Sequence, residues 1–166
     1  MTPTEFKQAR QSLDQILRAG RVRRWHSNPD LSHVDDSVEA HAGRVAKIIA
    51  YLWPDASADL LRMALRHDDG EVATGDVSGE FKRLCPDMAS MLSQLEAVHR
   101  VQMWGRDPVL TDLDAKRLDL ADKLDAYLFA ARHAPEVMGG DGWPEARDRI
   151  LAAAYALGVI EKLETV

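Results

Sequence analysis

Residues 60–76 read LLRMALRHDDGEVATGD, and this stretch joins a helical apolar stripe to a dense polar cluster. The stripe stops at the adjacent pair His67-Asp68, and Glu71 follows four residues after His67. If the helix continues through this pair, Glu71 projects from the same face as His67, one turn further on. A carboxylate in that position can transfer protons. The apolar residues of the stripe are Leu60, Leu61, Ala64 and Leu65, which recur at helical spacing.

On both sides of this stretch, apolar residues recur at helical spacing, and no segment alternates as a strand would. Prolines lie between successive stripes, where a helix should stop. Asp36 and Glu39 resemble a capping box at a helix start. We therefore predict an all-α bundle of about six helices, with irregular stretches at residues 25–36 and 69–82. The five further stripes are Phe6, Ala9, Leu13, Ile16 and Leu17; Val38, Val45, Ile48, Ile49 and Leu52; Met88, Met91, Leu92, Leu95 and Val98; Leu118, Ala121, Leu124, Tyr127 and Leu128; and Ile150, Leu151, Ala154 and Leu157.

Length and composition are those of a small globular protein. The 166 residues, 46% of them apolar, suit a single domain over residues 1–166 with one core. The lone cysteine, Cys85, cannot form an internal disulfide, and neither a signal segment nor an apolar run of about 20 residues is present. These features predict a cytoplasmic protein that binds no membrane. The net charge of −6 disfavours a nucleic-acid polymer as partner, because such binding neutralises many phosphates.

Polar residues interrupt the apolar stripes at two further places. His41 interrupts one stripe and Asp122 interrupts another. Burying these side chains and His67-Asp68 without partners would be costly, and a shared metal ion removes that cost. Two imidazoles and two carboxylates form a mixed nitrogen and oxygen site for one divalent ion, which can be Co, Mn, Fe, Ni or Zn.

Each of these residues also has a purely structural interpretation, and these alternatives stay open. Taken alone, His41 is more typical of a packed core histidine. His67 can lie at a helix C-terminus, where a protonated imidazole suits the helix dipole. Asp122 can be a solvated carboxylate beside Lys123, and Glu71 can be a surface residue at a helix end.

The order of these residues resembles a known signature. His41, then His67-Asp68, then Asp122 is similar to the H…HD…D pattern of the HD superfamily of metal-dependent phosphohydrolases. Residues 67–76, HDDGEVATGD, resemble the HD-x-x-E-x-x-x-G-D segment of bacterial HD-domain 5′-deoxynucleotidases.

Two flanking segments extend this resemblance. Arg24-Trp25 resembles the pair that precedes the first ligand in those enzymes, and residues 121–127, ADKLDAY, resemble their last-ligand helix. The resemblance covers about residues 23–127 and implies a single-domain HD-type helical bundle.

The resemblance implies a role for each candidate residue. The four candidate ligands would hold one divalent metal ion, and Glu71 would be the general acid or base in the attack of water on phosphorus. Arg24 would bind phosphate, and Lys82 would be a further phosphate contact. Trp25 would press against the sugar or base and help exclude a 2′-hydroxyl, and Asp76 would accept a hydrogen bond from a sugar hydroxyl.

Departures from the family pattern lie around the expected substrate. The first ligand stands in Ala40-His41-Ala42, where relatives often have Glu-His-Ser, and Asp119 stands where relatives often carry a basic residue. The segment between Trp25 and His41 is also slightly longer than in the family.

Two reactions and one non-catalytic function therefore remain. The favoured reaction releases orthophosphate from deoxynucleoside monophosphates. The alternative releases tripolyphosphate from a deoxynucleoside triphosphate such as dATP, as in small phage enzymes of the superfamily. A nucleotide-binding HD module without activity is the third possibility. The cations available for a triphosphate are Arg23, Arg24, Lys82, Lys116 and Arg117.

The resemblance also implies a homo-oligomer, with a dimer as the favoured state. The last predicted helix, Trp143 to Leu163, is a candidate contact surface between subunits.

Overall fold

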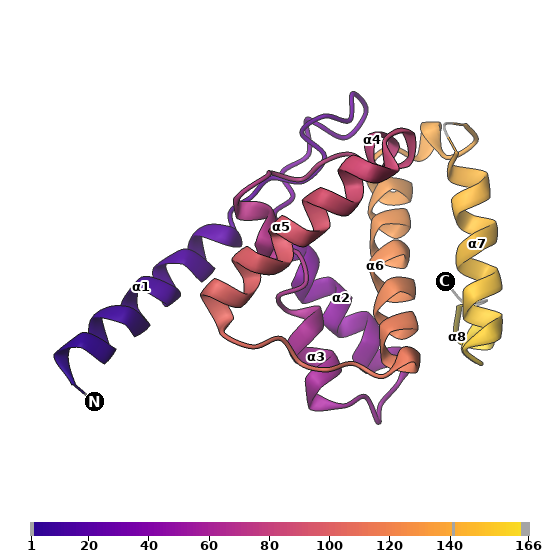
Figure 1. The fold of residues 1–166 in the computed structure, drawn as a ribbon. Coiled ribbons are helices and arrows are strands. Elements are labelled where there is room, and N and C mark those ends of the chain that lie inside the picture. The colour runs from indigo at the N-terminus through magenta and orange to yellow at the C-terminus, as the bar shows by residue number, and fades with distance from the viewer. Residues whose placement is uncertain (1, 141, 164–166) are drawn as a thin grey trace. The chain divides into compact units, whose positions relative to one another are not determined.

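Helices account for the regular structure of this protein (Figure 1). The computed structural model describes residues 2–140 and 142–163, and in these ranges no β-strand forms. A single isolated bridge between Arg23 and Ser37 is the β-type pairing found there. The α-helices are α1 (Pro3–Ala19), α2 (Val38–Leu52), α3 (Ala58–Ala64), α4 (Gly79–Leu84), α5 (Pro86–Trp104), α6 (Asp112–His133), α7 (Trp143–Ala156) and α8 (Ile160–Leu163), and two 3-10 turns are η1 (Asp69–Val72) and η2 (Pro135–Val137).

The prediction of an all-α fold is confirmed, and the six predicted stripes lie on helices except for Leu65 and Leu157, which follow the last residues of α3 and α7. The helix starts follow local chemistry. Thr2 and Glu5 form a reciprocal capping box on α1, and the side chains of Ser57 and Thr111 cap α3 and α6. The sequence did not predict α4, which has 6 residues, whereas α8, which has 4, is the end of the helix predicted over Trp143 to Leu163. α4 and η1 lie in the stretch of residues 69–82, which the sequence indicated as irregular.

The chain divides into two compact units by its internal contacts. The first unit is Met1–Ala42 with Arg66–Asp107, and the second is Gly43–Leu65 with Pro108–Val166. The boundary falls inside α2, between Ala42 and Gly43. The prediction of one domain over residues 1–166 stays a prediction.

The second unit contains a conventional apolar core. Apolar side chains from α2, α3, α6 and α7 meet there, and Leu60, Ala64 and Ala121 are fully buried. Burial of this kind is the main favourable contribution to folding. The buried members of the cluster are Val45, Ile49, Leu52, Trp53, Leu60, Ala64, Leu120, Ala121, Leu124, Ile150, Ala154 and Val159.

The first unit has a different interior, because much of it is polar. Of the seven buried polar or charged residues in the described part of the chain, six belong to this unit and only Asp125 belongs to the other. Buried polar groups are costly unless partners or a ligand satisfy them. The six are Arg24, Asp36, His41, Arg66, Asp69 and Glu71.

Three local predictions need correction. Asp36 does not cap α2, because the Ser37 hydroxyl accepts the Ala40 N–H at 3.2 Å and takes that role. The helix predicted over Trp143 to Leu163 is interrupted between α7 and α8, where Gly158 adopts a φ of 69° that L-residues rarely adopt. The helix that ends in residues 60–65 does not continue through His67, since α3 stops at Ala64.

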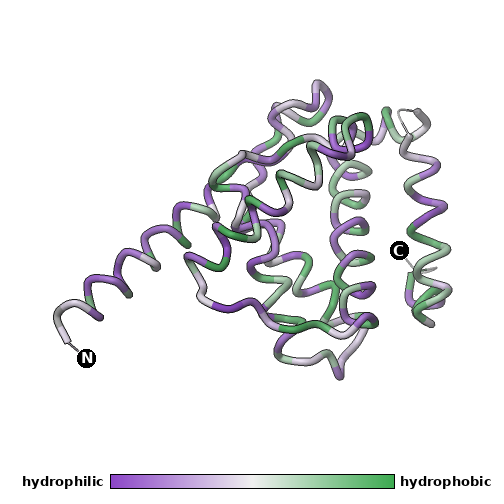
Figure 2. The backbone as a smooth tube through the Cα atoms, in the orientation of Figure 1, coloured by the Kyte–Doolittle hydropathy of each residue, from purple (hydrophilic) through white to green (hydrophobic). Residues whose placement is uncertain are grey.

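The apolar stripe of α1 is largely exposed in the first unit. Phe6, Leu13 and Leu17 keep 58%, 59% and 60% of their surface accessible. Figure 2 shows hydrophobic and hydrophilic residues alternating along this helix. Helical spacing thus predicted the helix but not the burial of its apolar face. Within residues 2–140 and 142–163, no helix has both the length and the apolar character needed to cross a membrane.

Candidate metal centre

His67 and Asp68 lie in a turn between two helical segments. α3 ends at Ala64, residues 65–68 form turns, and η1 begins at Asp69. His67 and Asp68 therefore lie on irregular backbone between the α-helix and the 3-10 turn. Both residues belong to the first unit. His67 is close to buried and Asp68 is half-buried.

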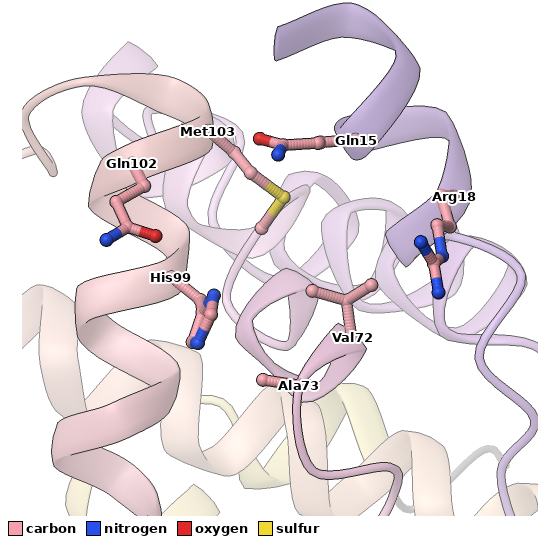
Figure 3. A pocket seen from close by; sticks show the side chains of 7 residues that line it. All are labelled: Gln15, Arg18, Val72, Ala73, His99, Gln102 and Met103. Atoms are coloured by element: carbon pink, nitrogen blue, oxygen red, sulfur yellow. The ribbon is translucent and has the colours of Figure 1, made fainter. Parts of the chain in front are cut away.

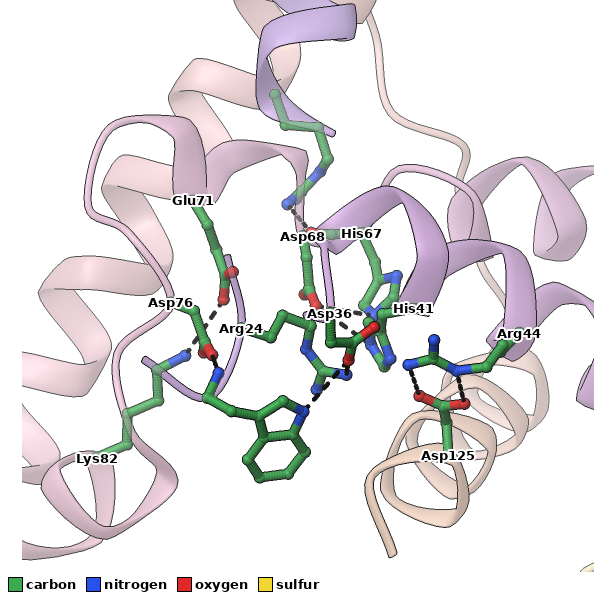
Figure 4. A network of polar contacts seen from close by, with 12 residues as sticks. Arg24, Asp36, His41, Arg44, His67, Asp68, Glu71, Asp76, Lys82 and Asp125 are labelled. Carbon is green, nitrogen blue, oxygen red and sulfur yellow. Dashed lines mark hydrogen bonds and ion pairs between the residues drawn. The ribbon is translucent and has the colours of Figure 1, made fainter. Parts of the chain in front are cut away.

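His41 approaches the same place from α2. Its side chain is fully buried, and its Nε2 lies 3.4 Å from Asp68 Oδ2. The Nε2 of His67 lies 3.3 Å from the same oxygen, and the two imidazole centres are 5.2 Å apart (Figure 4). The structure therefore brings three sequence-predicted ligands together within one unit.

These three side chains could hold a metal ion, and their spacing fits one. Ligand atoms about 2.1 Å from a shared ion lie about 3.0–3.4 Å from one another. The two imidazole-to-carboxylate distances, 3.4 and 3.3 Å, agree with that requirement. Two nitrogen donors and one carboxylate oxygen are a donor set that divalent transition metals accept.

Asp122, the fourth predicted ligand, belongs to the second unit. It lies on α6 and is half-buried. Its participation beside the three ligands of the first unit stays a prediction.

Glu71 is a buried carboxyl group close to the candidate ligand Asp68. It lies in η1 with 5% of its surface exposed, and its Oε2 has no hydrogen-bond partner in the described part of the chain. Burial, followed by the negative charges of Asp68 and Asp76, raises the pKa of Glu71 to about 9. Lys82 Nζ, 3.9 Å from Glu71 Oε1, acts in the opposite direction but is too far for a hydrogen bond. Glu71 therefore holds a proton at neutral pH in the metal-free protein.

Arg24 and Trp25 are organised by Asp36, which sequence reasoning assigned only to a helix cap. Arg24 Nη1 lies 3.5 Å from Asp36 Oδ2, and the same oxygen accepts the Trp25 indole N–H at 3.2 Å. The Arg24 backbone N–H also donates to the Asp36 carbonyl at 3.0 Å. Asp36 is 2% exposed, so its carboxylate is shielded from water.

Trp25 has an unusual backbone conformation that Asp76 supports. Its φ is 62°, the left-handed region that a bulky residue rarely occupies. Its backbone N–H donates to Asp76 Oδ2 at 3.0 Å across 51 residues of sequence. Such strain persists where the surroundings determine it, and it occurs often at functional sites. Asp76 therefore supports the conformation of Trp25 through this hydrogen bond.

α5 holds the turn that carries His67, and sequence reasoning missed this contribution. Arg100 Nη1 donates to the His67 carbonyl at 2.9 Å, and Arg100 Nε donates to Asp107 at 2.9 Å. The Trp104 indole donates to Asp69 at 2.6 Å. Burial raises the pKa of Asp69 to about 6, against the lowering effect of the Trp104 hydrogen bond. The roles of Arg100 and Trp104 could not be predicted, because a helical pattern does not indicate hydrogen-bond partners that lie 33 to 35 residues away in the sequence.

A second missed pair lies within the second unit. Arg44 on α2 binds Asp125 on α6 through two hydrogen bonds, of 2.7 and 3.1 Å (Figure 4). The guanidinium also lies 4.9 Å from the centre of the Phe129 ring. Bidentate pairs of this kind fix orientation as well as adding stability.

Some of the cationic side chains that the sequence offered as contacts for a triphosphate have carboxylate partners in the structure. Arg117, in the second unit, pairs with Asp114 at 3.3 Å and lies over the Trp53 ring. Arg23 is exposed and lies 3.9 Å from Asp35. Arg24 and Lys82 are the two cations of this set that lie in the polar network of the first unit (Figure 4).

Neither a scan against models of known protein families nor a search of curated proteins finds a match to this chain.

Proposed function

We propose that this protein is a divalent-metal-dependent phosphohydrolase of the HD type that acts on deoxynucleotides. The observation that carries the proposal is the convergence of His41, His67 and Asp68 beside the buried Glu71. In the proposed site, Asp122 of the second unit supplies a fourth ligand, as the order of the ligands in the sequence indicates. A non-catalytic module would have no need for a buried, protonated Glu71, whose desolvation costs free energy.

A divalent ion in this site would polarise a phosphoryl oxygen and make a bound water more acidic. The protein itself supplies the proton transfer. Glu71 holds its proton in a buried site and releases it when positive charge comes close, because that charge favours the ionised carboxylate. The ionised form can accept a proton from the attacking water, and the protonated form can donate one to the leaving oxygen.

The phosphate would be oriented by Arg24 and Lys82. Asp36 keeps the guanidinium of Arg24 in one orientation, so its planar fork is ready for two phosphate oxygens. Lys82 adds a point charge near Glu71. With two such cations in the first unit, the site suits a monophosphate better than a triphosphate, and we therefore favour 5′-deoxynucleotidase activity.

The sugar would be recognised by Trp25 and Asp76. The hydrogen bond from the Trp25 backbone occupies only one carboxylate oxygen of Asp76, so the other oxygen can accept from a sugar hydroxyl. The Trp25 ring is held by its indole hydrogen bond to Asp36. A rigid ring in this place can exclude a 2′-hydroxyl by shape.

The test is to incubate purified protein, loaded with Co²⁺ or Mn²⁺, with each dNMP, each dNTP and the matching ribonucleotides, and to identify the phosphate product. We expect orthophosphate from the dNMPs and little product from ribonucleotides. Tripolyphosphate from dNTPs would identify the alternative reaction instead. If no nucleotide is cleaved although the metal binds, the protein is not a nucleotide phosphohydrolase.

Paired variants sharpen this test. Glu71→Gln should lower the rate by at least about 100-fold, the usual contribution of general acid–base catalysis, without loss of metal binding. Glu80, exposed on α4, provides the matched control, and Glu80→Gln should keep the wild-type rate. A wild-type rate in Glu71→Gln would exclude the proposed role of this carboxyl group.

A further inference from the structure

The first unit contains a cavity of about 200 Å³ on another side of η1 (Figure 3). It lies among α1, the end of η1 and α5, and none of its lining residues belongs to the candidate metal centre. Its lining residues are Gln15, Arg18, Val72, Ala73, His99, Gln102 and Met103.

The rim of this cavity offers hydrogen-bond donors and no negative charge. Four of the seven lining residues, Gln15, Arg18, His99 and Gln102, have polar side chains, and none of the seven is acidic, although the chain has 27 Asp and Glu residues. Within residues 2–140 and 142–163, no hydrogen bond or ion pair engages these four side chains. Figure 3 shows Arg18 from α1 and His99 from α5 on opposite sides of Val72. The exposed guanidinium of Arg18 and three further side chains that can donate hydrogen bonds favour an anion.

The size of the cavity restricts the ligand. Pockets for drug-sized molecules measure about 300–1,000 Å³, so a cavity of about 200 Å³ favours a ligand smaller than a whole nucleotide. Met103, which is 5% exposed, and Val72 give it an apolar wall. A compact oxyanion fits both the size and the donors, since guanidinium groups bind such oxygens through paired hydrogen bonds.

The wall of the cavity is also part of the turn that presents Glu71. A 3-10 turn has three residues per turn, so Glu71, Val72 and Ala73 project in three different directions. Glu71 projects toward Asp76 and Lys82 (Figure 4), whereas Val72 and Ala73 line the cavity. A ligand that contacts Val72 and Ala73 therefore acts on the same short backbone segment as Glu71.

We propose that this cavity is an effector site for a small oxyanion of phosphate size, bound by Arg18, His99 and the two glutamines. Occupation of the site adjusts the η1 turn and with it the position of Glu71. Binding of the oxyanion does not depend on the proposed function, because the site is separate from the candidate ligands, whereas an effect on catalysis through Glu71 rests on it.

The test is a titration of the full-length chain with inorganic phosphate, followed by the ¹⁵N–¹H NMR signals of the backbone amides. EDTA is present, and potassium chloride keeps the ionic strength constant. We expect saturable shifts at Arg18, Val72, Ala73 and Gln102, together with a shift at Glu71 that follows the same binding curve.

Three variants locate the binding. Arg18→Gln should weaken phosphate binding at least about tenfold, as expected for the loss of a charged hydrogen bond. Arg10→Gln makes the same charge change about two turns earlier on α1, away from the cavity, and should change the affinity less than twofold. Ala73→Leu fills part of the cavity without a change in charge and should also weaken binding.

A fourth variant separates this site from the proposed active site. Arg24→Gln should leave the shifts at Arg18 and Gln102 intact, even if phosphate binding near Trp25 is lost. The proposal is overturned if the shifts do not saturate, if Arg10→Gln weakens binding as much as Arg18→Gln, or if Arg24→Gln abolishes the shifts around the cavity.

Discussion

The protonation of Glu71 links the candidate site to the stability of the whole protein. Its pKa is raised from 4.5 to about 9, mainly by burial, so the folded state binds this proton more tightly than the unfolded state does. The stabilising contribution is complete below pH of about 4.5 and is lost as the pH rises toward about 9. We expect the free energy of unfolding of the metal-free protein to fall across this window by up to about 1.4 kcal/mol per pH unit from this group.

Urea denaturation in EDTA at several pH values measures this effect. Glu71→Gln keeps the shape of the side chain without the titration, so its unfolding free energy should vary less between pH 5 and pH 9, a range of about four units. Glu80→Gln, on the exposed surface of α4, should retain the wild-type profile. Parallel profiles for wild-type and Glu71→Gln would show that Glu71 is ionised throughout.

Arg100 is the residue that connects α5 to the His67 backbone. Its guanidinium donates at once to the His67 carbonyl and to Asp107, a pairing that the single ammonium group of lysine cannot reproduce. Outer residues that orient metal ligands typically contribute about 10- to 100-fold in metal affinity. Arg100→Lys should therefore weaken Mn²⁺ or Co²⁺ binding at least about tenfold.

Calorimetric titration of each metal-free protein measures that affinity. Arg83→Lys makes the same substitution at an exposed position of α4 and should bind the metal like wild type. A normal metal affinity in Arg100→Lys would show that the His67 turn keeps its geometry without this contact.

At the scale of elements, the contact between η1 and α5 depends on Gly70. A Cβ atom at position 70 would lie 2.2 Å from the carbonyl oxygen of Glu96 and 2.6 Å from the Cα atom of Glu96. Because both atoms belong to the helix backbone, no side-chain rotation relieves the clash. Gly70→Ala should destabilise the protein by about 1–3 kcal/mol or more, as expected for overpacking.

Gly43 provides the matched control for that substitution. It lies inside α2, and a Cβ there would meet nothing within 4 Å. Gly43→Ala should therefore stabilise the helix by about 0.5–1 kcal/mol, opposite in sign to Gly70→Ala. Thermal or urea unfolding of both variants tests the pair, and equal effects would contradict the close approach of η1 to α5.

The sequence predicted elements better than their ends. Helical spacing found every long helix, because the period of 3.6 residues is a local property. It did not find the end of α3 at Ala64, where the chain changes to turns and a 3-10 segment before Glu71. Nor did it separate Asp36 from Ser37 as the cap of α2, since both residue types suit that position.

At the scale of the whole molecule, the polar interior of the first unit explains which residues of the candidate site could be predicted from the sequence and which could not. His41 was predictable because it interrupts an apolar stripe. Arg100 and Trp104 were not, because each lies in a helix of ordinary pattern and acquires its role from partners over 30 residues away. The role of Asp36 in holding Arg24 and Trp25 likewise required the folded chain.

The proposed metal also makes a prediction about the two units. His41, His67 and Asp68 belong to the first unit, whereas Asp122 belongs to the second. If Asp122 is a ligand, bound metal stabilises both units, by about 2.7 kcal/mol when the free metal is at 100 times its dissociation constant. If it is not, the stabilisation is confined to the first unit.

Hydrogen exchange followed by mass spectrometry distinguishes these cases. Addition of Mn²⁺ should slow exchange in the peptide of residues 66–76 and in that of α6, residues 112–133. Asp122→Asn should abolish the protection of α6 and weaken metal binding, whereas Asp119→Asn, an exposed position on the same helix, should do neither. Protection of residues 66–76 alone in the wild-type protein would mean that the metal is held by the first unit only, and that α6 contributes no ligand.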